Sequence, residues 1–205
     1  MKEDIVFATN NKGKINEIRN IMADTGRQVM SMKEAGILVD PEENGSTYEE
    51  NALIKARAAA GLGLANCIVM ADDSGLEVDY LNKEPGIYSA RYLGEDTSYR
   101  IKNQTIIDRL AGAAGEARSA RFVCAIAAIL PSGRELVTRA ALEGRIGYEE
   151  KGSNGFGYDP IFYLPEYGKT TAELSEDEKN SISHRGKALQ RMKEELEKHE
   201  NIDCQ

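Results

Sequence analysis

The sequence predicts an α/β fold in which helices flank a twisted, mixed β-sheet. Short apolar segments alternate with helical patterns along the chain, and no segment repeats. Residues 120–130 form a nearly continuous apolar run, which is typical of a central strand buried on both faces. The turn at 131–133 and the segment 135–142 indicate an antiparallel partner for that strand.

The other elements follow from the spacing of apolar residues. Helices are predicted where such residues recur every three or four positions, and strands where short apolar runs end at glycine, proline or asparagine. The expected strands are 5–8, 28–32, 67–71 and 76–81, and the expected helices follow residues 13, 47, 97 and 175. Thr47 with Glu50, and Ser175 with Glu178, have the spacing of capping boxes at two of these helix starts.

Composition is that of an ordinary globular protein, and 205 residues fit a single domain, 1–205, possibly with two lobes. The net charge of -8 argues against a nucleic-acid polymer as partner, because an acidic surface repels a polyanion. The three cysteines form neither a disulfide framework nor a zinc-site spacing. We expect no signal peptide and no membrane span, and therefore a cytoplasmic protein.

Residues 8–14, with the sequence ATNNKGK, lead from a strand into a helix. The first N–H groups of a helix have no partner within it, so a helix start suits an anion. Thr9 and Asn10 add hydrogen-bonding side chains, and Lys14 adds a positive charge. The spacing of a Walker loop is missing. A helix cap with solvated lysines explains the segment as well as a phosphate site does.

Two acids, Asp72 and Asp73, follow the predicted strand 67–71 and precede Ser74. Side chains alternate along an extended chain, so the two carboxylates are expected on opposite faces. An Asx turn is one interpretation, because this is good turn chemistry. A ligand site is favoured, since ligands of open α/β sheets bind at the carboxyl ends of the strands.

The acidic segment before the second helix offers a further carboxylate, from Glu42 or Glu43. Magnesium is usually held by one or two carboxylates together with substrate phosphates, so one of these acids and Asp73 can supply such a pair. Asn51 and Lys55 are four residues apart and share a helix face. The alternative is a solvated helix start.

Residues 152–160 are rich in glycine, which permits close approach of the backbone to a ligand. Phe156 lies between two glycines and can offer a flat surface for stacking on a base. Asp159 adds a hydrogen-bond acceptor. The alternative is a flexible loop with Phe156 in the core.

Lys179, His184, Arg185 and Lys187 form a basic cluster in an otherwise acidic chain. An arginine has only donors, whereas a purine 6-oxo group accepts and the 6-amino group of adenine donates. Arg185 aimed at that position would therefore favour hypoxanthine, xanthine or guanine over adenine. For His184 alone, an exposed histidine at a helix start is the simpler interpretation.

Six segments together resemble the inosine triphosphate pyrophosphatase family, whose members act on ITP, dITP and XTP. They occur in the family's order over most of the chain: ATNNKGK, YEENALIKA, ADDSGLEV, PGIYSARY, GSNGFGYDP and EKNSISHRGKAL. The one visible departure is Asn10, where many members have glycine.

The resemblance implies a two-lobed fold with a cleft between the lobes, a homodimer and a requirement for Mg²⁺. It implies that Asp73 is the catalytic base and a metal ligand, and that Glu42, or else the adjacent Glu43, is the second metal ligand. The residues that it implies for substrate binding are Thr9, Asn10, Lys14, Lys55, Ser74, Phe156, Gly157, Tyr158, Asp159, Lys179, His184 and Arg185.

The expected reaction is attack of water on the α-phosphorus of a purine nucleoside triphosphate, which releases pyrophosphate. Two alternatives remain open from the sequence. One is a pyrophosphatase for modified pyrimidine nucleotides, and the other is a nucleotide-binding module without enzymatic activity.

Overall fold

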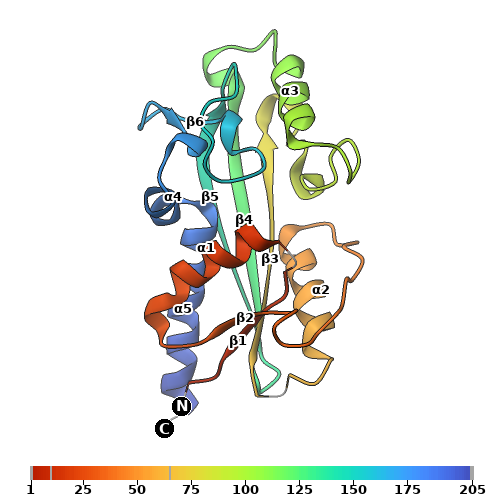
Figure 1. Ribbon diagram of the computed structural model, residues 1–205, viewed down its shortest axis with the longest axis vertical. Helices are drawn as coiled ribbons and strands as arrows, with labels where there is room; N and C mark the ends of the chain where they lie inside the picture. The colour runs from red at the N-terminus through yellow and green to blue at the C-terminus, as the bar shows by residue number, and fades with distance from the viewer. Residues whose placement is uncertain (1, 10, 65, 204–205) are drawn as a thin grey trace. The chain divides into compact units, whose positions relative to one another are not determined.

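The computed structural model describes residues 2–9, 11–64 and 66–203 (Figure 1). Its strands are β1 (Ile5–Phe7), β2 (Val29–Ser31), β3 (Ile68–Val78), β4 (Ser119–Ile129), β5 (Glu135–Ile146), β6 (Phe162–Leu164) and β7 (Lys169–Thr170). Its α-helices are α1 (Lys12–Met22), α2 (Tyr48–Ala60), α3 (Tyr99–Arg109), α4 (Glu176–Ile182) and α5 (His184–Asp203).

The described strands form one mixed sheet in the order β2-β1-β3-β4-β5-β6-β7. Strand β1 pairs in parallel with β2 and with β3, whereas β6 pairs antiparallel with β5 and with β7. The predicted mixed α/β fold is therefore confirmed. In the part of the chain that the structure describes, no helix combines the length and the apolar composition that a membrane crossing requires.

The chain divides into two compact units. The first unit consists of Met1–Asp73, Cys124–Ala140 and Arg185–Gln205, and the second of Ser74–Val123 and Ala141–His184. The reason for this division is visible in the burial pattern, because each unit has a hydrophobic core cluster of its own.

The core of the first unit lies between the sheet and two helices. Figure 1 shows α1 and α5 next to each other, and apolar residues of both helices belong to one cluster. Ile15, Ile18 and Met22 of α1 meet Leu189 and Met192 of α5 there. The apolar residues that predicted α1 by their spacing of three or four positions are therefore the residues that it buries.

The core of the second unit forms around α3 and the adjoining strands. Ile106 of α3 is buried with Leu76, and the rings of Phe122 and Phe162 lie with their centroids 4.2 Å apart. Strand β4 is buried along most of its length, as its apolar run predicted. The turn to β5 is closed by the Leu130 N–H, which donates to the Arg134 carbonyl.

Three predicted local features were wrong. No turn interrupts β3 at 72–75, because the backbone beyond it has partners: the Leu76 N–H donates to Ser89 Oγ over 2.8 Å. The helix predicted after 175 is divided at Ser183, whose ψ of 157° is extended rather than helical. Thr47 caps its helix as predicted, because its hydroxyl accepts the Glu50 N–H over 3.1 Å, but the Glu50 carboxylate accepts from Ser46 and does not complete the capping box. The box of Ser175 and Glu178 is confirmed.

Candidate active site

Asp73 is held by two side chains of α2 in the first unit. Asn51 donates from Nδ2 to Asp73 Oδ2 over 3.1 Å, and Lys55 Nζ lies 3.4 Å from Asp73 Oδ1. Both contacts come from one face of α2, because the two residues are one turn apart. Asn51 is itself fixed, since its Oδ1 accepts the Gly45 N–H over 2.9 Å. A Cβ at Gly45 would lie 2.7 Å from that oxygen, so only glycine permits this approach.

Lys55 also contacts the acidic segment before α2. Its Nζ lies 2.9 Å from Glu43 Oε1, so two carboxylates, those of Glu43 and Asp73, share one ammonium group. Glu42 is exposed, and the ion pair of Lys55 is formed with Glu43 instead. Of the two acids that the sequence offered, Glu43 is the one beside Asp73.

Asp72 points to a different set of partners. Lys14 Nζ lies 3.0 Å from Asp72 Oδ2, and Arg185 donates to the same oxygen from Nη2 over 3.3 Å. Arg185 also forms an ion pair with Glu17 of α1. The result is a buried series of alternating charges, Glu17, Arg185, Asp72 and Lys14, in which Arg185 is only 2% exposed.

The two adjacent acids have opposite pKa shifts. Burial raises the pKa of Asp73, and the charge of Glu43 adds to that effect against the opposing charge of Lys55. Burial also acts to raise the pKa of Asp72, but the charges of Lys14, Arg185 and Lys55 outweigh it and hold the pKa well below its usual range. Asp72 is therefore a permanent anion at neutral pH, whereas Asp73 is the better proton acceptor.

The start of α1 is capped by the side chain of Asn11. Asn11 Oδ1 accepts the N–H groups of Gly13 and Lys14, over 2.9 and 3.1 Å, and Thr9 Oγ1 accepts the Asn11 N–H. The predicted helix cap is thus present, but Lys14 is not a solvated lysine because it is paired with Asp72. Asn10, which was predicted to bind substrate, lies outside the described residues.

A second group of candidate residues lies in the second unit. Lys179 Nζ donates to Asp159 Oδ2 over 2.7 Å, and the same oxygen accepts the Phe156 N–H over 2.8 Å. The Lys179 ammonium also lies over the Phe156 ring, 5.1 Å from its centroid. Gly155 has φ of +75°, and a Cβ there would lie 2.2 Å from Asp159 Oδ2. Glycine is therefore required for the loop to close around that carboxylate.

The other predicted substrate residues of the second unit are more strongly engaged in packing. Tyr158 is buried and donates its hydroxyl to the Ser89 carbonyl over 2.7 Å. His184 is buried with its ring stacked on Phe122, at 4.9 Å between centroids, so it is not the exposed histidine of the simpler interpretation. Ser74 is half-buried in β3, and Gly157 has a positive φ of 69°.

The sequence analysis did not single out Glu17, and it considered Asp72 only as the neighbour of Asp73. Glu17 follows Lys14 by three residues on α1, which places both on one helix face, and this spacing is the signal that was available. The pairing of Glu17 with Arg185 joins residues 168 positions apart and has no local signature.

A protein-family model described as the Ham1 family matches residues 5–195 of the chain. The chain is 46% identical over 195 residues to the dITP/XTP pyrophosphatase of Clostridium perfringens, covering 93% of this chain and 96% of that protein. It is 45% identical to the dITP/XTP pyrophosphatase of Bacillus subtilis, covering 96% and 98%.

Among solved structures, the Ham1 protein of Staphylococcus aureus superposes with a TM-score of 0.84 at 44% identity, covering 96% of this chain and 100% of that one. A HAM1 protein from Coxiella burnetii gives the same TM-score at 40% identity, with the same coverage of both chains. The structural similarity to both proteins extends over nearly the whole of each chain.

Proposed function

The chain belongs to the Ham1 family, and on this premise we propose that it hydrolyses non-canonical purine nucleoside triphosphates, XTP, ITP and dITP, to the monophosphate and pyrophosphate. The similarity to proteins named dITP/XTP pyrophosphatase, over nearly their full length, supports this activity. Such a reaction removes these nucleotides from the pool that polymerases use.

The observation that carries the proposal is the arrangement around Lys55. Two carboxylates of different elements, Asp73 and Glu43, face one ammonium group, and Asn51 fixes the orientation of Asp73. The adjacent Asp72 adds a third carboxylate, which is buried. This grouping suits a reaction in which a strongly anionic substrate is bound and water is activated.

The same residues fit Mg²⁺. Their donors are carboxylate oxygens, which Mg²⁺ prefers, and the like charge of Glu43 acts to raise the pKa of Asp73. Among the described residues no group of three or more His, Cys, Asp or Glu side chains forms a metal site. Because substrate phosphates can supply further oxygen ligands, two carboxylates suffice, and we propose that Asp73 and Glu43, rather than Glu42, hold Mg²⁺ together with phosphate oxygens. The bound ion would neutralise charge on the phosphate chain.

The roles of the protein's own groups follow from their charge. Asp73 accepts a proton from a water molecule whose oxygen attacks the α-phosphorus. The bond from the α-phosphorus to the bridging oxygen breaks, and pyrophosphate leaves with the electron pair. Lys14 and Lys55 stabilise the charge that develops on the leaving group. The proton on Asp73 then returns to solvent.

The remaining sequence-based assignments are part of the proposal. Thr9, Asn10 and Ser74 are assigned to the phosphate and sugar, and the loop that carries Phe156 is assigned to the base, on which its ring stacks. The members of the base-binding set are Phe156, Gly157, Tyr158, Asp159, Lys179, His184 and Arg185. We further propose a homodimer and a cytoplasmic location.

A product assay tests the function. With ITP as substrate and Mg²⁺ present, we expect inosine monophosphate and pyrophosphate in equal amounts, and no turnover when the metal is chelated. Diphosphate with orthophosphate would place cleavage at the wrong bond and refute the proposed attack. A panel of ITP, XTP, dITP, ATP, GTP and dUTP tests the substrate class. A higher kcat/KM for dUTP than for ITP would refute the purine assignment.

A further inference from the structure

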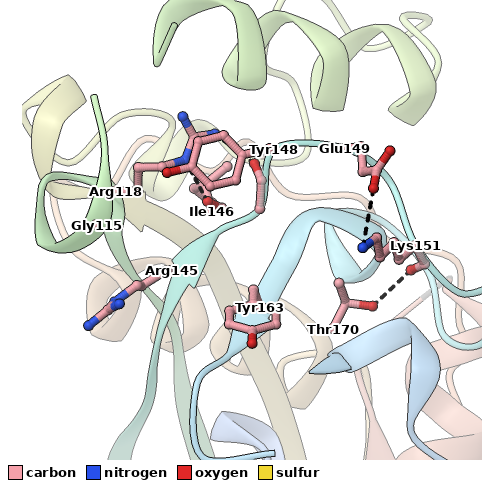
Figure 2. Close-up of a pocket in the computed structure, with 10 residues that line it drawn as sticks. Gly115, Arg118, Arg145, Ile146, Tyr148, Glu149, Lys151, Tyr163 and Thr170 are labelled. Carbon is pink, nitrogen blue, oxygen red and sulfur yellow. Dashed lines mark hydrogen bonds and ion pairs between the residues drawn. The ribbon is translucent and has the colours of Figure 1, made fainter. Parts of the chain in front are cut away.

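A pocket in the second unit lies among residues that none of the assignments above uses. Its volume is about 380 Å³, which is within the range of small-molecule sites, about 300–1,000 Å³. Figure 2 shows it between the end of β5, the segment that follows, and strands β6 and β7. The lining residues are Gly115, Arg118, Arg145, Ile146, Gly147, Tyr148, Glu149, Lys151, Tyr163 and Thr170.

Arg118 gives this pocket a buried positive charge. The side chain is 2% exposed and donates to backbone carbonyls: from Nε to Ile146 over 2.7 Å, and from Nη2 to Gly147 over 2.6 Å. A third bond runs from Nη1 to the Leu110 carbonyl over 2.8 Å. Among the described residues no carboxylate forms an ion pair with Arg118. Carbonyl dipoles alone therefore hold this cation, and burial lowers the pKa of its guanidinium from the ordinary value.

The other charges around the pocket cancel in pairs. Lys151 forms an ion pair with Glu149 over 3.2 Å, and Arg145 forms one with Glu116, which lies outside the lining. The excess charge is therefore that of Arg118, which is positive in a chain whose net charge is -8. A ligand that complements the pocket carries a negative charge, and Lys151 and Arg145 are long side chains that can turn toward it.

Two tyrosines give the pocket flat apolar surfaces. The Tyr148 ring lies over the Arg118 guanidinium, which is 4.3 Å from the ring centroid, and 67% of this tyrosine is exposed. Tyr163, on β6, also lines the pocket, and Figure 2 shows it apart from Tyr148. An exposed aromatic ring such as that of Tyr148 accepts any planar ring system, because stacking does not depend on the pattern of donors and acceptors.

We propose that this pocket binds a planar heteroaromatic anion of the class of a purine nucleoside monophosphate. Its ring stacks on Tyr148, and its phosphate lies toward Lys151, in the field of Arg118. Few side chains are placed to recognise the edge of a base, so adenine and hypoxanthine are bound alike. The inference stands on the pocket itself and does not depend on the proposed hydrolysis.

Calorimetric titration of the full chain with adenosine monophosphate tests the proposal. This probe is chosen because the proposed active site disfavours a 6-amino purine. We expect saturable binding that Tyr148→Ala weakens about 5- to 150-fold, from the usual strength of stacking on one aromatic ring. Lys151→Gln weakens it as well. In neither variant does kcat/KM for ITP change, because neither residue belongs to the proposed active site.

Two matched variants control for general effects on the protein. Tyr88 is 57% exposed and lies over Arg91, so Tyr88→Ala removes the same kind of contact outside the pocket. The Lys83 ammonium is 53% exposed and pairs with Asp79 much as Lys151 pairs with Glu149, so Lys83→Gln is the control for charge. Both controls should bind adenosine monophosphate as the wild type does.

Two further ligands separate the contribution of the stacked ring from that of the phosphate. Adenosine and inorganic phosphate should each bind more weakly than adenosine monophosphate. Phosphate that binds as tightly as the nucleotide would refute the planar class and indicate a simple anion site. Absence of nucleotide binding, or equal binding by Tyr148→Ala and the wild type, would overturn the proposal.

Discussion

The ammonium group of Lys55 lies 3.4 Å from Oδ1 of Asp73. The same nitrogen is 2.9 Å from Glu43, so a single positive charge faces two carboxylates. Burial favours the neutral form of Asp73, and the neighbouring acid adds to that preference. The site is thus prepared for an incoming cation and for proton transfer, and each role leads to a separate prediction.

Replacing Asp73 by asparagine should stop catalysis without unfolding the protein. The amide is similar in size to the carboxylate but cannot accept a proton from water, and a general base contributes about 10²- to 10⁴-fold to a rate. We expect kcat for ITP to fall by that factor, while the midpoint of urea unfolding stays close to that of the wild type. Asp79→Asn, which changes a partly exposed acid of the second unit, serves as control. A fully active Asp73→Asn enzyme would exclude this residue as the base.

Glu43→Gln and Glu42→Gln form a matched pair, because the two acids are adjacent and only Glu43 contacts Lys55. If Glu43 is the second metal ligand, its variant should need a higher Mg²⁺ concentration for half-maximal activity. A shift of about 10-fold corresponds to about 1.4 kcal/mol of lost binding free energy. Glu42→Gln should leave the Mg²⁺ titration unchanged. The reverse result would assign the metal to Glu42.

Arg185→Met should lower the free energy of unfolding strongly. The change leaves Glu17 and Asp72 buried without their shared cation, and breaking a buried pair in this way costs about 3–5 kcal/mol. Urea denaturation measures the loss. Lys198→Met, on the same helix but at an exposed ion pair, should cost no more than about 1 kcal/mol. Similar costs for the two variants would contradict the buried network.

The same position offers a test of base recognition. Arg185→Lys keeps a positive charge for Asp72 and Glu17 but loses the planar group that can pair with a 6-oxo purine. If Arg185 reads the base, the ratio of kcat/KM for ITP to that for ATP should fall by a factor of about 5 to 150, the usual value of one bidentate contact. An unchanged ratio, with lowered stability, would leave Arg185 with a structural role only.

Much of the site was predictable from local sequence, because its contacts arise from regular periodicity. Alternation along β3 predicted that Asp72 and Asp73 would have different partners, and they contact Lys14 and Lys55 respectively. The four-residue spacing of Asn51 and Lys55 predicted that both would reach one point. Such statements need only the geometry of a strand or a helix.

Other features depend on tertiary structure and were missed for that reason. Strands β6 and β7 have three and two residues, too few for any hydrophobic period to emerge. The predicted turn at 72–75 was wrong because pairing and burial of β3 overrode the local preference of these residues. The ion pairs of Arg185 with Glu17 and Asp72 were not predicted, because these partners come from segments far away in sequence.

The free energy of unfolding, measured at acidic pH, should depend on the pairing of Asp72 with Lys14. The pKa of Asp72 is lowered in the folded state. The pairing therefore stabilises the folded protein to its full extent at pH values above the pKa of Asp72 in the unfolded chain, which is about 3.9. That stabilisation is lost as the pH falls through the folded-state pKa, because protonated Asp72 no longer attracts Lys14. Comparison with Lys14→Met reports this contribution, to which the smaller effect of the Lys14 charge on the pKa of Asp73 is added.

We therefore expect a difference in unfolding free energy between the wild type and Lys14→Met that is constant above about pH 5 and narrows below about pH 4. Urea denaturation across this range, without added divalent cation, measures it. A difference that stayed constant down to the acid end of the range would mean that Lys14 stabilises the folded state by contacts other than its pairing with Asp72. In that case the alternating order of charges from Glu17 to Lys14 would not be what keeps Asp72 ionised.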